Sequence, residues 1–270
     1  MPWCCRDKKL EYGKKTLIMG IVNVTPDSFS DGGKYFNADD AVNHALQLIE
    51  QGADIIDIGA QSTRPNYEEI TKEQEWQRIK PVLKKLREKT DLPISVDTYF
   101  PYVAENALNL GADIINDISG AVHIKMAEIV KKRGCGWVIM HNGSADIAEM
   151  RHFFIKSAEK CESLGVDKAQ LCFDMGIGFG KSYEQNLSLI ANIGEYKLKG
   201  YPLLLGASRK RVIGEGSRQP NVEKRIFGNI AADTAAILGG ADIIRLHDVE
   251  SEKQGIYMAD ELKKLVNYNG

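Results

Sequence analysis

Short apolar runs rich in β-branched residues alternate along the chain with stretches of helical periodicity. Between residues 38 and 49 the apolar side chains fall at i, i+3, i+4, i+7, i+8 and i+11, which makes one apolar face of a helix. Asn37 stands where a helix N-cap is expected. Thr71 and Gln74 have the spacing of a capping box, so a second helix is predicted to begin there.

The pentapeptide Gly-Ala-Asp-Ile-Ile occurs three times, at residues 52–56, 111–115 and 240–244, and each copy follows a helical pattern. A glycine directly after a helix suits the left-handed residue that ends it, and paired isoleucines are typical of a buried strand. Each copy therefore predicts a helix, a tight turn and a strand.

Over the whole chain this alternation predicts eight strands and eight helices. We expect strands near 16–24, 54–59, 93–98, 113–117, 136–141, 170–174, 202–207 and 242–247. Helices are expected near 38–51, 72–90, 100–110, 124–133, 146–164, 185–192, 224–239 and 251–266. Eight alternating pairs in about 250 residues are typical of a (β/α)8 TIM barrel, an α/β fold, here predicted as a single domain over residues 1–270. A doubly wound sheet is the alternative, but it expects a glycine-rich turn after the first strand, where this chain has Thr-Pro-Asp-Ser.

Composition narrows the class of partner. The formal net charge is −2, which argues against nucleic acid, because binding to phosphate backbones requires a basic excess. No apolar run reaches the roughly 18–20 residues that span a bilayer, and no secretory signal is expected at the amino terminus. Five cysteines without a Cys-x-x-Cys spacing predict neither a disulfide framework nor a zinc site. We therefore expect a cytoplasmic globular protein.

Three strand-to-helix connections are long, at 25–37, 60–71 and 208–223, and in a barrel all of them emerge at the mouth where active sites lie. The predicted strands also end in polar residues, namely Asn23, Asp57, Asp97, Asn116, Asp117, His141, Asp174, Ser208, Lys210, Arg245 and His247. We interpret Asp57 and Asp117 as helix caps or Asx turns. The others place acceptors on one side of the mouth and cations on the other, which suits a ligand with a donor-rich heterocyclic edge and an anionic tail.

Residues 176–182 are glycine-rich and end in Lys-Ser, like a phosphate-binding loop. That motif requires glycine at position 175, where this chain has Met175, so a P-loop nucleotide hydrolase is the weakest interpretation. We expect the loop either to make a tight turn after a strand or to lie flat against a planar ligand.

Taken together, these motifs resemble the signatures of the dihydropteroate synthase family. The longest match runs over residues 18–33, and shorter ones follow in order at 62–65, 94–98, 114–117, 140–141, 176–181, 208–210 and 245–248. The resemblance covers about residues 16 to 250 and implies a (β/α)8 transferase of the folate pathway. Such an enzyme joins 6-hydroxymethyl-7,8-dihydropterin pyrophosphate to 4-aminobenzoate and releases pyrophosphate with the help of Mg²⁺. It also implies a homodimer formed through the last helices.

The resemblance implies that five residues bind the pterin. Asp174 is expected to accept hydrogen bonds from the 2-amino and ring N–H groups, while Asn116 meets the neighbouring pyrimidine edge. Lys210 is expected to donate to the acceptor side of the pterin. Met140 and Phe179 would supply apolar contacts.

The remaining assignments concern the leaving group and the second substrate. Asn23, Arg245 and His247 are expected to hold pyrophosphate, with Asn23 also a Mg²⁺ ligand. Asp97 is expected to stabilise positive charge on the pterin, and it forms the catalytic set with Lys210, Arg245 and His247. The aminobenzoate site is expected to contain Phe29, Thr63, Arg64, Pro65 and Ser208.

The chain departs from the family at four positions. Ala60-Gln61 replaces Gly-Glu, Asn66 replaces a glycine, and Met175 stands where proline is usual. The changes at Gln61 and Asn66 fall in the second long loop and leave a rival open, a pterin-binding paralogue without synthase activity. A methyltransferase acting on a methylated folate is another rival, against which the Ser-Arg-Lys motif at 208–210 and the first loop argue.

Overall fold

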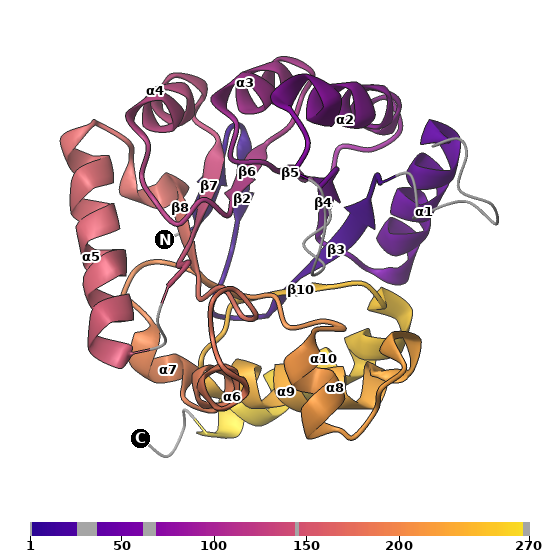
Figure 1. The fold of residues 1–270 in the computed structure, drawn as a ribbon, viewed down its shortest axis with the longest axis vertical. Helices are drawn as coiled ribbons and strands as arrows, with labels where there is room; N and C mark the ends of the chain where they lie inside the picture. The colour runs from indigo at the N-terminus through magenta and orange to yellow at the C-terminus, as the bar shows by residue number, and fades with distance from the viewer. Residues whose placement is uncertain (1, 26–36, 62–68, 144–145, 267–270) are drawn as a thin grey trace.

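The computed structural model describes residues 2–25, 37–61, 69–143 and 146–266. Eight parallel strands close into a barrel in the order β10-β3-β4-β5-β6-β7-β8-β9, and helices surround it (Figure 1). The strands are β3 (Leu17–Asn23), β4 (Ile55–Gly59), β5 (Ile94–Asp97), β6 (Ile114–Asp117), β7 (Gly136–Met140), β8 (Leu171–Asp174), β9 (Leu203–Leu205) and β10 (Ile243–Leu246). Each lies within a predicted range, so the (β/α)8 prediction is confirmed and the doubly wound sheet is excluded.

The helices that follow these strands are α1 (Ala38–Gln51), α2 (Lys72–Arg87), α3 (Pro101–Asn109), α4 (Ile124–Arg133), α5 (Ile147–Ser163), α6 (Tyr183–Ala191), α9 (Ile226–Gly239) and α10 (Val249–Val266). Asn37 accepts from the backbone of Asp39, and Thr71 forms the predicted capping box with Gln74. Additional short helices are α7 (Ile193–Tyr196), α8 (Arg211–Gly216), η1 (Lys168–Gln170) and η2 (Val222–Lys224). The sequence predicted residues 208–223 as a long loop, whereas α8 and the start of η2 lie within it. None of the described helices is long and apolar enough to cross a membrane.

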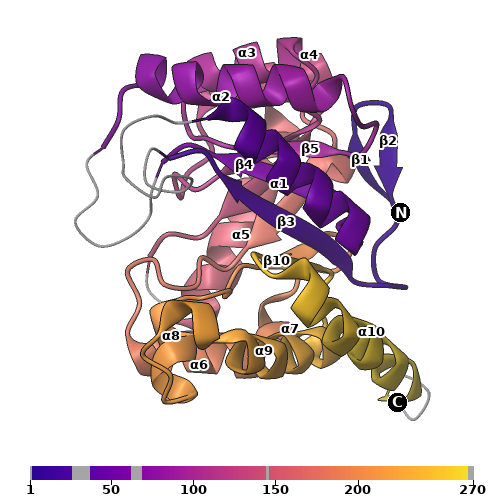
Figure 2. The ribbon, with the colours of Figure 1, turned by 90° about the vertical axis from the view of Figure 1, so that its right-hand side faces the viewer.

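A hairpin that the sequence analysis did not predict covers the end of the barrel opposite the mouth. Its strands are β1 (Trp3–Cys5) and β2 (Lys8–Leu10), which pair antiparallel (Figure 2). Trp3 is fully buried, and its indole N–H donates to the carbonyl of Gln170 at 2.8 Å. Three-residue strands containing Lys8 and Lys9 are too short and too polar to show an alternating pattern.

The three Gly-Ala-Asp-Ile-Ile copies form the predicted helix, turn and strand. Gly52, Gly111 and Gly240 have φ of 108°, 98° and 116°, a left-handed conformation that glycine adopts without steric cost. The copies begin β4, β6 and β10 at the closed end of the barrel.

The aspartate of each copy serves one further purpose, which is to hold the neighbouring strand. Carboxylate oxygens of Asp54, Asp113 and Asp242 accept the backbone N–H groups of Ile18, Ile94 and Leu203 at 2.9, 3.0 and 3.0 Å. Each neighbouring strand precedes its own in the barrel order, so the same staple recurs three times around the closed end.

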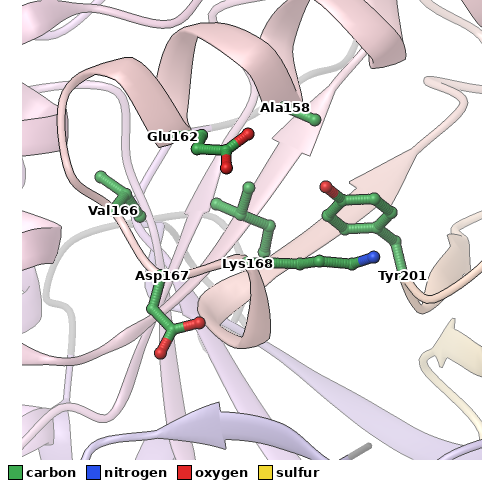
Figure 3. A pocket seen from close by; sticks show the side chains of 7 residues that line it. Ala158, Glu162, Val166, Asp167, Lys168 and Tyr201 are labelled. Atoms are coloured by element: carbon green, nitrogen blue, oxygen red, sulfur yellow. The ribbon is translucent and has the colours of Figure 1, made fainter.

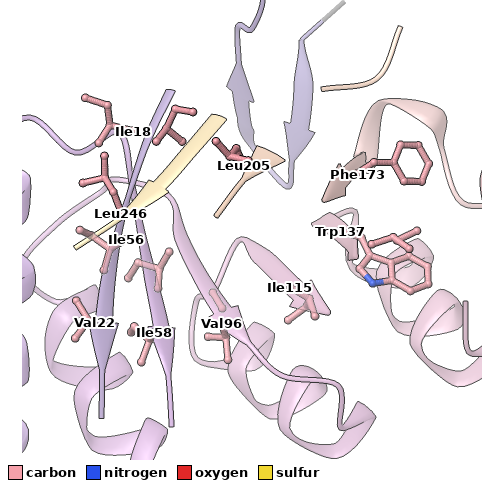
Figure 4. Packing of buried hydrophobic residues seen from close by; sticks show 14 of the residues in the cluster. Ile18, Val22, Ile56, Ile58, Val96, Ile115, Trp137, Phe173, Leu205 and Leu246 are labelled. Atoms are coloured by element: carbon pink, nitrogen blue, oxygen red, sulfur yellow. The ribbon is translucent and has the colours of Figure 1, made fainter. Parts of the chain in front are cut away.

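Because successive side chains point to opposite faces of each strand, the apolar strand residues form two separate clusters. Ile18, Val22 and Ile56 pack outward against the surrounding helices (Figure 4). Leu17, Met19 and their counterparts on other strands fill the interior next to Trp3 and the hairpin. The interior is therefore packed with apolar side chains at the hairpin end, and its polar residues lie nearer the mouth.

Candidate active site

Strand alternation directs a set of polar side chains into the barrel near its mouth. Ile55 and Ile243 belong to the interior cluster, so the residues two positions later on β4 and β10 point inward as well. The same alternation applies to β5, β6 and β8. We call the resulting set the mouth layer, and it consists of Asp57, Asp97, Asn116, Asp174 and Arg245.

Arg245 occupies the centre of the mouth layer. Its Nε lies 2.7 Å from Asp57 Oδ2, and its Nη2 lies 3.1 Å from Asp97 Oδ2. Asn116 Nδ2 donates to the same Asp57 oxygen at 3.2 Å. The interpretation of Asp57 as a helix cap or Asx turn is therefore wrong, because its carboxylate is buried in the barrel and paired with Arg245.

Asp117, by contrast, behaves as predicted. It follows the inward-facing Asn116 by one residue, so its side chain points to the outside of the barrel. Its Oδ1 accepts the backbone N–H of Ser119 at 2.9 Å, which is the geometry of an Asx turn.

Burial sets the proton affinity of the acids near Arg245. It raises the pKa of Asp97 to about 7, although the Arg245 charge works in the opposite direction. It also raises the pKa of Glu75, on the first turn of α2, to about 7, while a hydrogen bond with Thr98 opposes this shift. The sequence analysis did not identify Glu75, whose only signal is a charged residue on the apolar side of a helix.

The glycine-rich loop after β8 supports Asp174. The backbone N–H of Gly176 donates to Asp174 Oδ1 at 2.8 Å, and Gly176 has a φ of 65°. A Cβ at Gly176 would lie 2.1 Å from the carbonyl oxygen of His141, so no other residue fits. Burial raises the pKa of Asp174, and the positive charge of Lys210 opposes that rise.

Lys181 holds this loop in place and was also missed by the sequence analysis. Its ammonium donates to the carbonyls of His141, Gly176 and Phe179 at 3.3, 3.0 and 3.0 Å. Burial lowers the pKa of Lys181 to about 8. A lysine directly after a glycine-rich turn is the signal that could have identified it.

Lys210 reaches the same loop from the turn between β9 and α8. Its Nζ donates to the carbonyl of Ile177 at 2.5 Å and lies 4.9 Å from the centre of the Phe179 ring. Burial lowers the pKa of Lys210 to about 8, and the charge of Asp174 opposes that shift. The structure thus brings Asp174, Phe179 and Lys210 together, as the sequence analysis expected.

The turn at 208–210 sets the directions of three consecutive side chains. Ser208 Oγ lies 3.1 Å from His247 Nδ1, and Arg209 turns away to form a bidentate pair with Asp248. Arg209 has a φ of 60°, a left-handed conformation that costs a residue with a Cβ about 1–2 kcal/mol. Burial, reinforced by the cations Arg209, Arg245 and Lys210, lowers the pKa of His247 to about 3, so its imidazole is neutral.

Two further predicted residues lie at strand ends, at positions whose side chains point into the barrel. Asn23 ends β3 beside Gly59, and Met140 ends β7 beside Asp174. Within the part of the chain that the structure describes, no cluster of three or more His, Cys, Asp or Glu side chains could hold a metal ion. Such a cage is not required for Mg²⁺, which is commonly bound by one or two protein oxygens together with substrate phosphates.

The predicted aminobenzoate residues are only partly visible. Phe29, Thr63, Arg64 and Pro65 lie outside the described residues, whereas Ser208 is buried beside His247. Gln61 directly precedes residues 62–68 and accepts a hydrogen bond from the Tyr99 hydroxyl at 3.3 Å.

A separate cavity of about 300 Å³ opens at the closed end of the barrel (Figure 3). It lies between α5, η1 and the start of β8, with Glu162 on one side and Lys168 over the Tyr201 ring at 4.6 Å. Because the polar strand ends lie at the opposite end of the barrel, this cavity is not the candidate active site.

Comparison with known proteins places this mouth in a family. The family model described as pterin binding enzyme matches residues 19–247. A dihydropteroate synthase of Clostridium beijerinckii is 42% identical over 260 residues, which cover 94% of this chain and 96% of that protein.

Solved structures agree with this match. A dihydropteroate synthase from Clostridium difficile, crystallised in the presence of pteroic acid, is 45% identical and superposes with a TM-score of 0.88, covering 94% of this chain and 98% of that one. The Xanthomonas albilineans enzyme in complex with 7,8-dihydropteroate is 37% identical with a TM-score of 0.84, covering 92% and 94%. The likeness therefore extends through the whole barrel.

Proposed function

The chain belongs to the pterin-binding enzyme family, among the dihydropteroate synthases, and from this premise we propose how its barrel mouth joins 6-hydroxymethyl-7,8-dihydropterin pyrophosphate to 4-aminobenzoate. The products are 7,8-dihydropteroate and pyrophosphate. The observation that carries this proposal is the polarity of the mouth. Its acceptors come from β4, β5, β6 and β8, whereas the cations Lys210 and Arg245 and the neutral imidazole of His247 come from the segments at β9 and β10.

Pterin recognition falls to the groups around Asp174. Its carboxylate accepts the 2-amino and adjacent ring N–H of the pterin, two parallel donors that match two carboxylate oxygens. Asn116 has a buried Oδ1 that accepts no hydrogen bond among the described residues, so it is available to the neighbouring pyrimidine edge. Lys210 donates to the acceptor side of the ring, with Met140 and Phe179 as apolar neighbours.

The chemical step separates charge. As the bond between the pterin methylene and the pyrophosphate oxygen breaks, positive charge grows on the pterin and negative charge grows on the leaving group. Asp97 stabilises the former, while Arg245 and His247 bind the latter, His247 as a neutral hydrogen-bond donor. The amine of 4-aminobenzoate then forms the new C–N bond and releases a proton. Since two substrates meet directly, no covalent enzyme intermediate is needed.

The cofactor we propose is Mg²⁺. The amide oxygen of Asn23, at the end of β3, is the protein ligand we assign to it, because hard cations take oxygen ligands. When bound to pyrophosphate, Mg²⁺ neutralises the charge that accumulates on the leaving group.

The aminobenzoate site is proposed to contain Ser208. Phe29, Thr63, Arg64 and Pro65 are assigned to it by their motifs. Water has to be kept from this site, because it competes with the amine for the cation.

The chain is also proposed to be a cytoplasmic homodimer that pairs through its last helices. Phe227 on α9 is 85% exposed, and Tyr257 and Met258 on α10 are 53% and 58% exposed. The two helices pack side by side, so their apolar residues offer a surface for a second copy (Figure 2). Light scattering should give twice the monomer mass, and Phe227→Lys should halve it.

One assay tests the activity. Purified protein is incubated with the pterin pyrophosphate, labelled 4-aminobenzoate and Mg²⁺, and labelled dihydropteroate is measured. Product formation supports the proposal. Pterin pyrophosphate binding without product would favour the paralogue that lacks synthase activity, and methyl transfer from a methylated folate would favour the methyltransferase.

A further inference from the structure

Two buried carboxyl groups meet between α9 and α10, outside the barrel wall. Asp233 is 2% exposed and Glu252 is 1% exposed, and the two carboxyl groups lie close enough to act directly on each other's protonation. No nitrogen or hydroxyl of the described residues donates to Asp233 Oδ2 or Glu252 Oε2. Two ionised carboxylates in contact and shielded from water repel one another, so this arrangement requires that one of them carry a proton.

The pair is connected to the active-site turn through Asn229, which is completely buried. Asn229 Nδ2 donates to Glu252 Oε1 at 3.3 Å, and Asn229 Oδ1 accepts the backbone N–H of Arg209 at 3.1 Å. Arg209 is the residue with left-handed backbone that separates Ser208 from Lys210. Two hydrogen bonds through Asn229 therefore connect Glu252, the neighbour of Asp233, to this turn.

We propose that Asp233 and Glu252 share a single proton and, through Asn229, act as positioning residues for the turn that presents Ser208 and Lys210 to the substrates. The inference rests on the proposed function, because it assigns these residues a part in the same site. It predicts that loss of the shared proton disturbs the turn and leaves the mouth layer unchanged.

The surroundings favour retention of the proton. The charged groups that face the pair from neighbouring segments are Arg209, before α8, and Asp248, before α10. Arg209 is already engaged by both oxygens of Asp248, and none of the ion pairs formed by the described residues includes Asp233 or Glu252. Burial, followed by the repulsion between the two groups, raises the pKa of Glu252, and burial raises that of Asp233.

Three variants separate the shared proton from the shape of the network. Glu252→Gln keeps an acceptor for Asn229 and gives Asp233 an amide donor. Glu252→Ala removes both contacts. Asp233→Asn supplies Glu252 with a fixed donor, which leaves no proton to share. Asp260→Asn is the matched control, since Asp260 is a buried carboxyl on the same helix that bonds Thr16 and does not contact the turn.

The first measurement needs no substrate. The folded state raises the pKa of both acids, so their contribution to stability is complete below the unfolded pKa of about 4 and is lost as the pH rises through the folded values. Between about pH 7 and about pH 10 the Tm of the wild type and of Asp260→Asn should therefore fall more than that of Asp233→Asn. Equal falls in all three proteins would overturn the shared proton, whether or not the protein is a synthase.

The second measurement uses the synthase assay over the same pH range. Glu252→Ala should lower kcat/KM by roughly tenfold or more, mainly through KM for the pterin pyrophosphate, and Glu252→Gln should restore it to within about threefold. In the wild type, kcat/KM should fall at alkaline pH, and this fall should be smaller in Asp233→Asn. Wild-type KM values in Glu252→Ala, or the same alkaline fall in Asp233→Asn, would overturn the positioning role. If Glu252→Ala does not fold, the comparison between wild type and Asp233→Asn still decides.

Discussion

Arg245 Nε lies 2.7 Å from Asp57 Oδ2, so the central cation of the barrel mouth is anchored by a carboxylate that is itself fully buried. The guanidinium also reaches Asp97, which is partly exposed. The more buried carboxylate fixes the position of Arg245, and the partner nearer the solvent can be displaced by a substrate anion.

Asp57→Asn should therefore impair both stability and catalysis. Breaking one side of a buried ion pair costs about 3–5 kcal/mol, because Arg245 loses the charge that compensates for its burial. We expect a lower Tm in thermal denaturation and a higher KM for the pterin pyrophosphate. If Asp97→Asn lowers the Tm equally, the two carboxylates do not differ in the way that their burial indicates.

Asp174→Ala should abolish pterin binding. The alanine removes the carboxylate that accepts both pterin donors and also leaves the N–H of Gly176 without its acceptor. Titration calorimetry with the pterin pyrophosphate should detect no binding, whereas Asp174→Asn should retain a weakened signal. Unchanged affinity in the alanine variant would remove Asp174 from the site.

Pterin binding should weaken above about pH 8. Burial lowers the pKa of both Lys181 and Lys210 to about 8. Each lysine has its full set of donor hydrogens for the loop carbonyls only when it is protonated. Affinity should therefore be constant below this pH and decline above it. Lys181→Met should lower the affinity by roughly tenfold at neutral pH, since three carbonyls lose a donor. A flat profile up to about pH 10 would contradict the assigned roles of both lysines.

Gln61→Glu should change the handling of 4-aminobenzoate. The change restores the family residue beside the second long loop and keeps an acceptor for the Tyr99 hydroxyl. We expect a changed KM for 4-aminobenzoate with an unchanged KM for the pterin pyrophosphate. Tyr99→Phe is the matched control, because it removes the same hydrogen bond without adding charge. Identical kinetics in Gln61→Glu would show that this departure from the family is neutral.

Trp3→Ala should destabilise the barrel without changing its chemistry. The fully buried indole fills the closed end, and removing a large aromatic side chain from a core costs about 3–5 kcal/mol. Tm should fall clearly, with kcat and KM within about twofold of the wild type at a temperature where the variant is folded. Tyr102→Ala, at an exposed position, should leave Tm nearly unchanged.

The sequence predicted the barrel well because its signals are local and repeated. The left-handed glycines and the capped helices identified the elements, and the strand ends identified most of the mouth. The sequence pattern alone did not distinguish the roles of Asp57 and Asp117. Both come soon after a pair of isoleucines, but only the phase of the alternation, which starts from the inward Ile55 on β4 and the inward Ile114 on β6, distinguishes the buried ion-pair partner from the Asx turn.

The remaining misses depend on contacts between distant parts of the chain. The hairpin at residues 3–10 is recognisable only from the barrel end that it covers. Lys181 binds carbonyls that include that of His141, directly after β7, and the Asp233–Glu252 pair forms only when α9 and α10 pack together. None of these relationships leaves a periodic pattern in the sequence.

Different aspartates serve the two ends of the barrel. Asp54, Asp113 and Asp242 hold strands in register at the end that takes no part in the reaction, while the mouth carboxylates face cations and substrate. The register of these strands is thus secured away from the mouth, so a change among the mouth residues leaves the three staples intact.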